Sequence, residues 1–219
     1  AGTPACGGPD GRRAMPVLAA YRAALQARPL RTKAATSFVL FGTGNALVQA
    51  AEQRRPRETG ASAASFSARK VAACSVYGAG LYAPGMHVWY QALERWLPST
   101  ALPSTCCKLA LHSAFAAPAI ISSFTLATKT LEGAPLGESI AALRDRGPQM
   151  WLTALGFINI GLFINYQFMP LPYRVMFGNC VQLLWTTYQC WELGREGSHA
   201  APLGEPLPPA AVVLHAPAQ

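Results

Sequence analysis

Two histidines lie in stretches of sequence that are otherwise almost free of ionisable side chains. These are His87, within residues 71–93, and His112, within residues 109–128. An imidazole in such surroundings can ligate a metal, relay a proton or, in a photosynthetic membrane, bind the central ion of chlorophyll. Neither has a Cys, Asp or Glu at ligand spacing, so the sequence specifies no metal site and no resident cofactor, with pigment contact as an alternative for His112.

Uncharged polar residues occur in the same kind of apolar stretch. Asn45, Gln49 and Asn159, together with His112, could line a water-filled path or contact a pigment. Further candidates for such a path are His87, Asn165, Gln167, Asn179 and Gln182. Hydrogen bonding between packed helices explains the whole set as well, and is the interpretation that the sequence favours.

Patterns typical of enzymes and of nucleic-acid-binding modules are missing. We find no nucleophile elbow, no glycine-rich phosphate loop, no H-E-x-x-H and no pair of carboxylates at catalytic spacing. The net charge of +8 comes without finger spacing or a basic helix with stacking aromatics. The sequence therefore predicts neither catalysis nor nucleic-acid binding.

The cysteines show no C-x-x-C spacing. They are Cys6, Cys74, Cys106, Cys107, Cys180 and Cys190, and three of them lie inside apolar stretches. We expect them to be small buried apolar side chains, not metal ligands or a disulfide framework. The adjacent pair Cys106 and Cys107 leaves a weak redox or metal-binding alternative open.

The elements that would position these residues are membrane helices. The chain is 51% hydrophobic and only 13% charged, and five stretches lack charge: residues 34–51, 71–93, 109–128, 147–173 and 175–191. A helix needs about 20 apolar residues to cross the hydrocarbon of a bilayer. The sequence thus predicts an all-α polytopic bundle of four to five transmembrane helices, preceded by an amphipathic helix carrying Val17, Leu18, Tyr21 and Leu25.

The domain organisation follows from these stretches. We expect an N-terminal extension over residues 1–16, a membrane helix bundle over 17–193 and a tail rich in proline and alanine over 194–219. The chain starts at Ala1 and not at Met, which fits a processed mature protein and a truncated chain equally well.

Several short motifs along residues 17–191 resemble one family. Tyr21, Leu25, Pro29 and Thr32 are similar to its first helix, and Lys108 with Ala117 and Pro118 is similar to a later lysine and A-P pair. The other motifs comprise Pro84, His87, Trp89 and Tyr90, then Asn165, Pro170, Tyr173 and Arg174, and finally Trp185 and Tyr188. In order and at this spacing, they resemble the family of the Mpv mitochondrial inner-membrane protein and the twenty-two-kilodalton peroxisomal membrane protein.

The resemblance implies a bundle of four or five helices in which these residues serve packing, with His87 as a hydrogen-bonding group near the interface. It also implies pores for small solutes in an organellar membrane. The chain departs from the family pattern at Asn45, at His112 with Ser113, and at Asn159. Several polar or ionisable residues that the family carries inside the bundle are replaced at these places.

Because of these departures and the long tail, we expect a non-enzymatic accessory subunit of a respiratory or photosynthetic membrane complex. A weakly selective channel for small metabolites is the alternative. The expected partners are membrane lipids and neighbouring subunits, the latter contacted by the N-terminus and the tail. The mitochondrial inner membrane is the favoured location and the thylakoid membrane the alternative.

Overall fold

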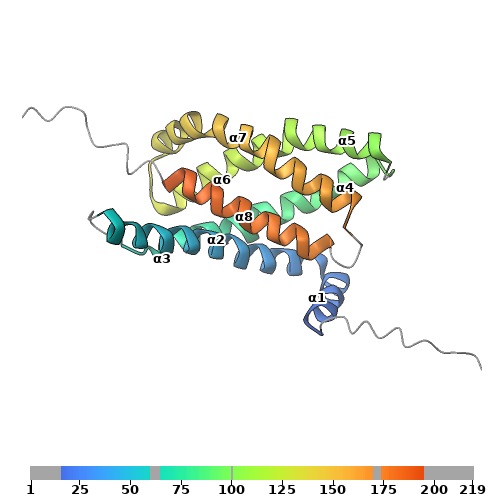
Figure 1. Cartoon of the computed structure of the whole chain (residues 1–219), viewed down its shortest axis with the longest axis horizontal. Helices are drawn as coiled ribbons and strands as arrows, with labels where there is room; N and C mark the ends of the chain where they lie inside the picture. Colours follow the sequence, from blue (N-terminus) through green and yellow to red (C-terminus); the bar gives the residue numbers. More distant parts are fainter. Residues whose placement is uncertain (1–15, 60–64, 100, 170–173, 195–219) are drawn as a thin grey trace, which may run out of the picture.

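The fold is a bundle of long helices, shown in Figure 1. The computed structural model describes residues 16–59, 65–99, 101–169 and 174–194. All the regular structure in these ranges is helical, as the sequence predicts. In chain order the elements are α1 (Pro16–Ala27), α2 (Pro29–Thr59), α3 (Ala68–Tyr77), η1 (Gly78–Tyr82), α4 (Ala83–Trp96), α5 (Leu102–Leu111), η2 (His112–Ala116), α6 (Ala117–Glu132), α7 (Leu136–Gln167) and α8 (Arg174–Gly194).

Two of the long helices contain a single widened turn at a proline. The helix from α3 to α4 passes through the π-turn η1, where the Ala83 N–H bonds to the Gly78 carbonyl, and Pro84 follows at once. The helix from α5 to α6 passes through η2, where the Ala117 N–H bonds to the His112 carbonyl, and Pro118 follows. A proline ring collides with the carbonyl four residues earlier in a regular α-helix, and a π-turn relieves this collision.

Helix α2 lies at the centre of the packing, against α3, η1 and α8, while α6 packs against α3 and α7. Glycines allow the closest approaches. A Cβ on Gly78 would lie 2.7 Å from the Ser37 carbonyl oxygen, and one on Gly44 would lie 3.1 Å from the Thr187 backbone nitrogen. Helices in lipid associate through such small residues, because there is no hydrophobic driving force between them.

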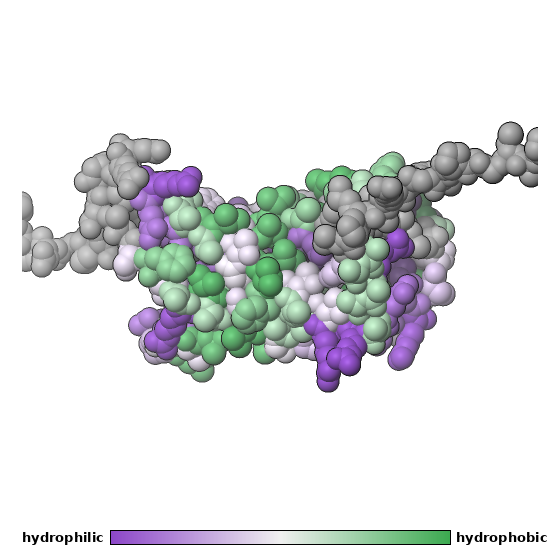
Figure 2. Space-filling model, turned by 90° about the horizontal axis from the view of Figure 1, so that it is seen from below, coloured by the Kyte–Doolittle hydropathy of each residue, from purple (hydrophilic) through white to green (hydrophobic). Residues whose placement is uncertain are grey.

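The distribution of polar side chains is the reverse of that in a soluble protein. Val39, Val88 and Phe115 expose more than half of their surface, whereas Thr125 and Gln189 are fully buried. Figure 2 shows hydrophilic residues gathered toward the two ends of one face, with hydrophobic residues between them. This arrangement is typical of a helix bundle in lipid.

Two helices of the described residues are long and apolar enough to cross a membrane, Leu102–Glu132 and Leu136–Gln167. In the most apolar part of these two helices, only 33% and 17% of the residues, respectively, are buried inside the chain. The core helices of a soluble protein are mostly buried. The expected total of four to five transmembrane helices stays a prediction. So does the position of α1 on the membrane surface, although a helix does end at Ala27, close to Pro29.

Two helices extend beyond their charge-free stretches. Helix α7 begins at Leu136, eleven residues before the predicted stretch, and passes through Gly147 and Pro148 to Gln167. Helix α2 likewise begins at Pro29 and continues to Thr59. Charged turns can continue a membrane helix where it leaves the hydrocarbon, so charge alone does not mark the ends. Residues 1–15 of the predicted N-terminal extension (1–16) and residues 195–219 of the predicted tail (194–219) lie outside the described residues.

The prediction that all the cysteines are buried is wrong for three of them. Cys74 and Cys190 are buried, with their Sγ atoms 3.7 Å apart between α3 and α8. Cys106, Cys107 and Cys180 are exposed. Small apolar side chains are tolerated on the outer surface of a membrane helix, so an apolar stretch does not tell which face is buried.

Candidate functional site

A cavity of about 440 Å³ occupies one half of the bundle. It is lined from α1, α2, η1, α4, η2, α6, α7 and α8, and it lies toward the end where α1, the turn between α4 and α5, and the end of α7 meet, at the right in Figure 1. We call this half, which includes Lys33, His87, His112 and Gln182, the cavity half. The closed half holds the other ends of these helices.

The outer part of the cavity carries its charged groups. The Lys33 ammonium donates to Nδ1 of His87 at 3.2 Å. Glu94 also lines the cavity, and its carboxylate accepts from Nζ of Lys108 at 3.1 Å. The Thr36 hydroxyl donates to Tyr21 Oη at 3.2 Å, and so connects α2 to α1 at the edge of the cavity.

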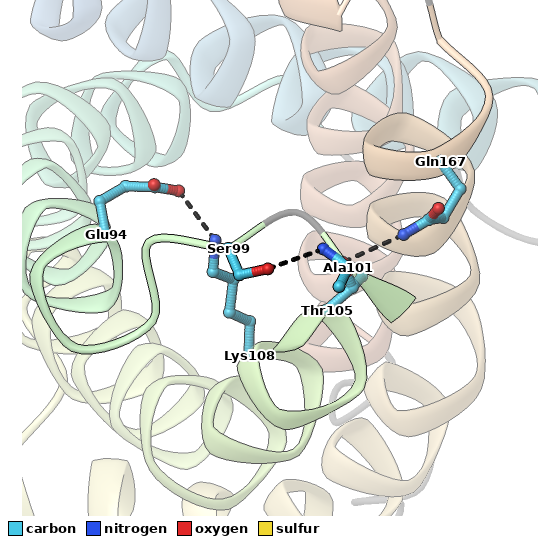
Figure 3. A network of polar contacts seen from close by, with 6 residues as sticks. All are labelled: Glu94, Ser99, Ala101, Thr105, Lys108 and Gln167. Atoms are coloured by element: carbon cyan, nitrogen blue, oxygen red, sulfur yellow. Dashed lines mark hydrogen bonds and ion pairs between the residues drawn. The ribbon is translucent and has the colours of Figure 1, made fainter. Parts of the chain in front are cut away.

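Polar contacts connect α4, α5 and α7 at this end of the bundle, as Figure 3 shows. Lys108 is only 5% exposed, so its pairing with Glu94 offsets the cost of burying an ammonium group. The Ser99 hydroxyl accepts from the Ala101 N–H at 3.1 Å in the intervening turn. Gln167, the last residue of α7, donates to the Thr105 hydroxyl at 3.0 Å. The ion pair with Lys108 therefore holds Glu94 at the edge of the cavity.

Deeper in the cavity, several polar atoms have no partner. His112 is 6% exposed and lines the cavity, and its Nδ1 makes no hydrogen bond within the described residues. The same is true of Oδ1 of Asn165. The Tyr82 hydroxyl donates to Gln182, which in turn donates to the Thr186 hydroxyl at 3.0 Å. Buried polar atoms are normally paired, so the unpaired ones point to water or a solute in the cavity.

Aromatic side chains separate the cavity from the closed half. Phe41, Tyr77 and Phe124 are almost completely buried, with ring centroids 5.2 to 6.0 Å apart. Phe41 also contacts Tyr82, a cavity-lining residue, at 4.9 Å. We call Phe41, Tyr77 and Phe124 the aromatic plug. They pack directly behind the cavity wall at Tyr82.

Polar residues nevertheless continue past the plug along one face of α8. Their spacing of three or four residues places them on the same side of the helix. The stripe comprises Asn179, Gln182, Thr186, Gln189 and Glu192. The first two line the cavity, and the last three are buried in the closed half. Both amide atoms of Gln189 lack a partner, while Glu192 accepts from Arg146 at 3.2 Å.

Of the residues proposed from the sequence as pore-lining, only some line the cavity. His112 lines the cavity, but Asn45, Gln49 and Asn159 do not. Gln49 donates to Asn45 at 2.7 Å and to the Ser67 carbonyl at 3.1 Å, and accepts from the Ser67 N–H at 2.6 Å. Asn159 donates to the Ser113 hydroxyl at 2.7 Å. These three amides connect helices and turns.

The comparison with known proteins adds a family. A model of the Mpv17 / PMP22 family matches residues 129–190. Peroxisomal membrane protein 2 of Bos taurus is 32% identical over 182 residues, which cover 83% of this chain and 90% of that protein. This chain belongs to the Mpv17 / PMP22 family.

Two more distant relatives also span most of the chain. Mitochondrial inner membrane protein Mpv17 of Bos taurus is 26% identical, over 80% of this chain and 97% of that protein. Protein sym-1 of Neurospora crassa is 25% identical, over 82% of this chain and all of that protein. No solved structure gives a significant match.

The residues that resemble the Mpv17 / PMP22 motifs fall into three groups. His87, Tyr90, Asn165 and Trp185 line the cavity. Pro29, Pro84, Lys108, Pro118 and Tyr188 belong to helix starts, π-turns or contacts between helices, with the Tyr188 hydroxyl 3.0 Å from that of Thr153. Trp89 lies within α4, and its Nε1 has no hydrogen-bond partner in the described structure. Pro170 and Tyr173 lie outside the described residues, as does the side chain of Arg174, the first residue of α8.

Sequence reasoning misses four residues of the site. Lys33 and Glu94 flank apolar stretches and resemble ordinary charged helix ends. Thr186 and Gln189 could be found, because they extend the spacing of Asn179 and Gln182 along one helix face. Among the residues that the structure describes, no three His, Cys, Asp or Glu side chains gather as a metal site requires.

Proposed function

We propose that the protein is a non-enzymatic channel that conducts small solutes across an organellar membrane and that the structure represents its closed state. The observation that carries this proposal is the cavity of about 440 Å³ inside a bundle of membrane helices. Ligand cavities of this size accommodate small organic molecules. The cavity also holds polar atoms that have no protein partner, which favours water or a solute inside it.

The stripe on α8 supports a route that extends beyond the cavity. In the closed state Gln189 is fully buried with an unpaired amide, which is energetically unfavourable in the interior of a bundle. A shift of the aromatic plug would hydrate this amide and join the cavity to the opposite end of the bundle. Hydrophobic constrictions of this kind gate channels by excluding water.

The test is the conductance of the purified protein in planar bilayers. Phe41→Ala removes the ring that contacts both Tyr77 and Tyr82, so we expect the open probability to rise by about tenfold or more. Val39→Ala is the matched control, because Val39 lies on the same helix and is 62% exposed. A silent wild-type protein together with a silent Phe41→Ala variant that retains its fold would contradict a channel.

An accessory-subunit role in a respiratory or photosynthetic complex stays a second prediction. The N-terminal residues and the tail that would contact neighbouring subunits lie outside the described residues. Comigration with a large complex at fixed stoichiometry in mild detergent would support this role. Isolation as a conducting oligomer would favour the channel.

The organelle and the bound molecules also stay predictions. The relatives are named as peroxisomal and as mitochondrial inner-membrane proteins, and the mitochondrial inner membrane remains the location that we propose for this chain. The thylakoid membrane and pigment contact at His112 are the alternative. We propose that bound lipids surround the protein. Import into isolated organelles followed by fractionation distinguishes these locations.

A further inference from the structure

We propose that the cavity selects small organic anions, and that it binds a monocarboxylate through Lys33 with the rest of the molecule against the inner wall. This inference rests on the proposed channel function and names its solute class. Four features support it: the free ammonium group of Lys33, the charges around it, the lining of the inner wall and the unpaired His112.

Lys33 provides a cation without a counter-ion. It lines the cavity and is partly buried, and its Nζ contacts the neutral acceptor His87 Nδ1. Within the described residues it forms no ion pair, in contrast to Lys108, whose partner is Glu94. An ammonium group has three N–H donors, so donors remain for a carboxylate. A charge held in partly apolar surroundings gains from an opposite charge.

The charges at this end of the bundle would attract anions. The basic residues in α1, around the start of α2, at the end of α4 and in α5 are Arg22, Arg28, Arg31, Lys33, Arg95 and Lys108. Glu94 is the one carboxylate in these described segments, and Lys108 already pairs with it. A cleft lined by charges of one sign concentrates solutes of the opposite sign.

The opposite end of the bundle is nearly balanced by comparison. Its basic residues among the described side chains are Arg54, Arg69, Lys70, Lys129, Arg144 and Arg146, and its acidic residues are Glu52, Glu132, Glu138, Asp145 and Glu192. Among the described side chains, the excess of positive charge is therefore concentrated at the end that carries the cavity. It would raise the local concentration of anions at that end.

The inner wall limits how much charge a solute can carry. It is lined by Ile121, Ile158 and Leu162, with His112 as a buried polar group among them. A second or third anionic group would lose its hydration against these side chains without a partner, which is costly. The carboxylate group of a monocarboxylate would bind Lys33, and the rest of the molecule would contact the apolar wall. A hydroxyl group on that body could donate to the free Nδ1 of His112.

The test compares permeability and binding in three variants of the full chain. Permeability is the reversal potential in planar bilayers under a tenfold gradient of potassium chloride and then of potassium lactate. Binding is the shift in melting temperature in detergent with sodium lactate, relative to sodium chloride. The variants are Lys33→Met, Lys33→Arg as the conservative replacement, and Arg31→Met, an exposed residue of the same helix that does not line the cavity.

We expect the wild-type protein to favour anions over potassium and to be stabilised by lactate. Lys33→Met should reduce the anion preference by about tenfold and abolish the lactate-dependent shift, while Lys33→Arg should retain both. Arg31→Met should change the preference by less than about twofold, because its charge lies outside the cavity. Equal melting temperatures without lactate would show that the variants are folded.

The outcomes separate the two proposals. A wild-type protein that conducts but prefers potassium, or a Lys33→Met variant with unchanged preference, would overturn the anion site and leave the channel intact. Stabilisation by lactate that depends on Lys33, in a protein that never conducts, would support the anion site and reject the channel. Cation binding by the rings of Tyr82 and Tyr90 is the competing result, and a preference for potassium would indicate it.

Discussion

The cavity half and the closed half of the bundle use polar residues differently. In the closed half Gln49 binds both backbone groups of Ser67, and Glu192 pairs with Arg146. In the cavity half Lys33 has no counter-ion in the described structure, and Nδ1 of His112 has no partner. Paired groups stabilise a single packing, whereas unpaired groups leave interactions for a solute. Thr125 and Gln189 are exceptions in the closed half, because their side-chain polar atoms have no partner, and Gln189 lies on the stripe that we propose as the continuing route.

The largest expected effect comes from breaking the ion pair of the closed half. Arg146→Met leaves the Glu192 carboxylate, whose side chain is 4% exposed, without its guanidinium partner. Removing one member of a buried pair costs about 3 kcal/mol, which lowers the melting temperature by on the order of 10 °C. Thermal unfolding in detergent measures the shift. Arg144→Met, at an exposed position of the same helix, should have little effect.

The matching change in the cavity half should cost far less. Lys33→Met removes a cation that makes no ion pair, so we expect a loss of stability below about 1 kcal/mol. Equal losses for Arg146→Met and Lys33→Met would show that the two halves do not differ in the way that we describe.

An effect of intermediate size should distinguish a connecting amide from one that faces the cavity. Gln49→Leu leaves the Ser67 N–H and Asn45 Oδ1 unpaired and should cost about 1 to 3 kcal/mol, with solute permeability unchanged. Asn165→Leu replaces a side chain whose Oδ1 is already unpaired, so it should spare stability and reduce permeability. Melting temperature and bilayer conductance, measured on both variants, provide the two readouts.

The opposite pattern of effects would indicate that Gln49 lines the pore. If Gln49→Leu altered permeability at an unchanged melting temperature, the amide would line the conducting path, as one interpretation of the sequence holds. The two variants thus serve as controls for each other, because each replaces an amide by a leucine within a long helix.

The sequence predicts the helical bundle because lipid imposes a simple rule. A spanning segment must be apolar over its length, and the stretches at 109–128 and 147–173 meet this rule and lie largely in helices that could cross a membrane. It does not predict how the helices rotate about their axes. Cys180 and Cys190 occur in the same charge-free stretch, yet Cys180 is exposed and Cys190 is buried. Rotation is decided by packing, here by close approaches at Gly44 and Gly78.

The candidate site is predictable to a similar extent. His112 could be selected because an ionisable group within an apolar stretch is costly unless it has a function. Asn45 and Gln49 are uncharged polar residues in an apolar stretch and could be selected on similar grounds, but they connect α2 to the turn before α3, and one sequence gives no information on that turn. Lys33 is missed because a lysine at a helix end is ordinary, and only the cavity beside it makes it a candidate.

The smallest expected effect concerns the π-turn that precedes Pro118. A π-turn inserts one extra residue, so its loss would rotate one side of the helix against the other by about 100°. His112 at its start and Ile121 beyond its end both line the cavity, and neither can rotate away without losing its packing. We therefore expect Pro118→Ala to keep the π-turn and to change stability by less than about 1 kcal/mol and permeability by less than about twofold.

The control for this prediction is Pro148→Ala, in the middle of α7, where the helix contains a proline without a π-turn. If packing maintains the turn at His112, the two variants should behave alike in melting temperature and in conductance. A large fall in permeability in Pro118→Ala alone would show that the proline ring itself holds His112 toward the cavity. In that case the geometry of the cavity half would depend on local backbone chemistry, and not on the surrounding helices.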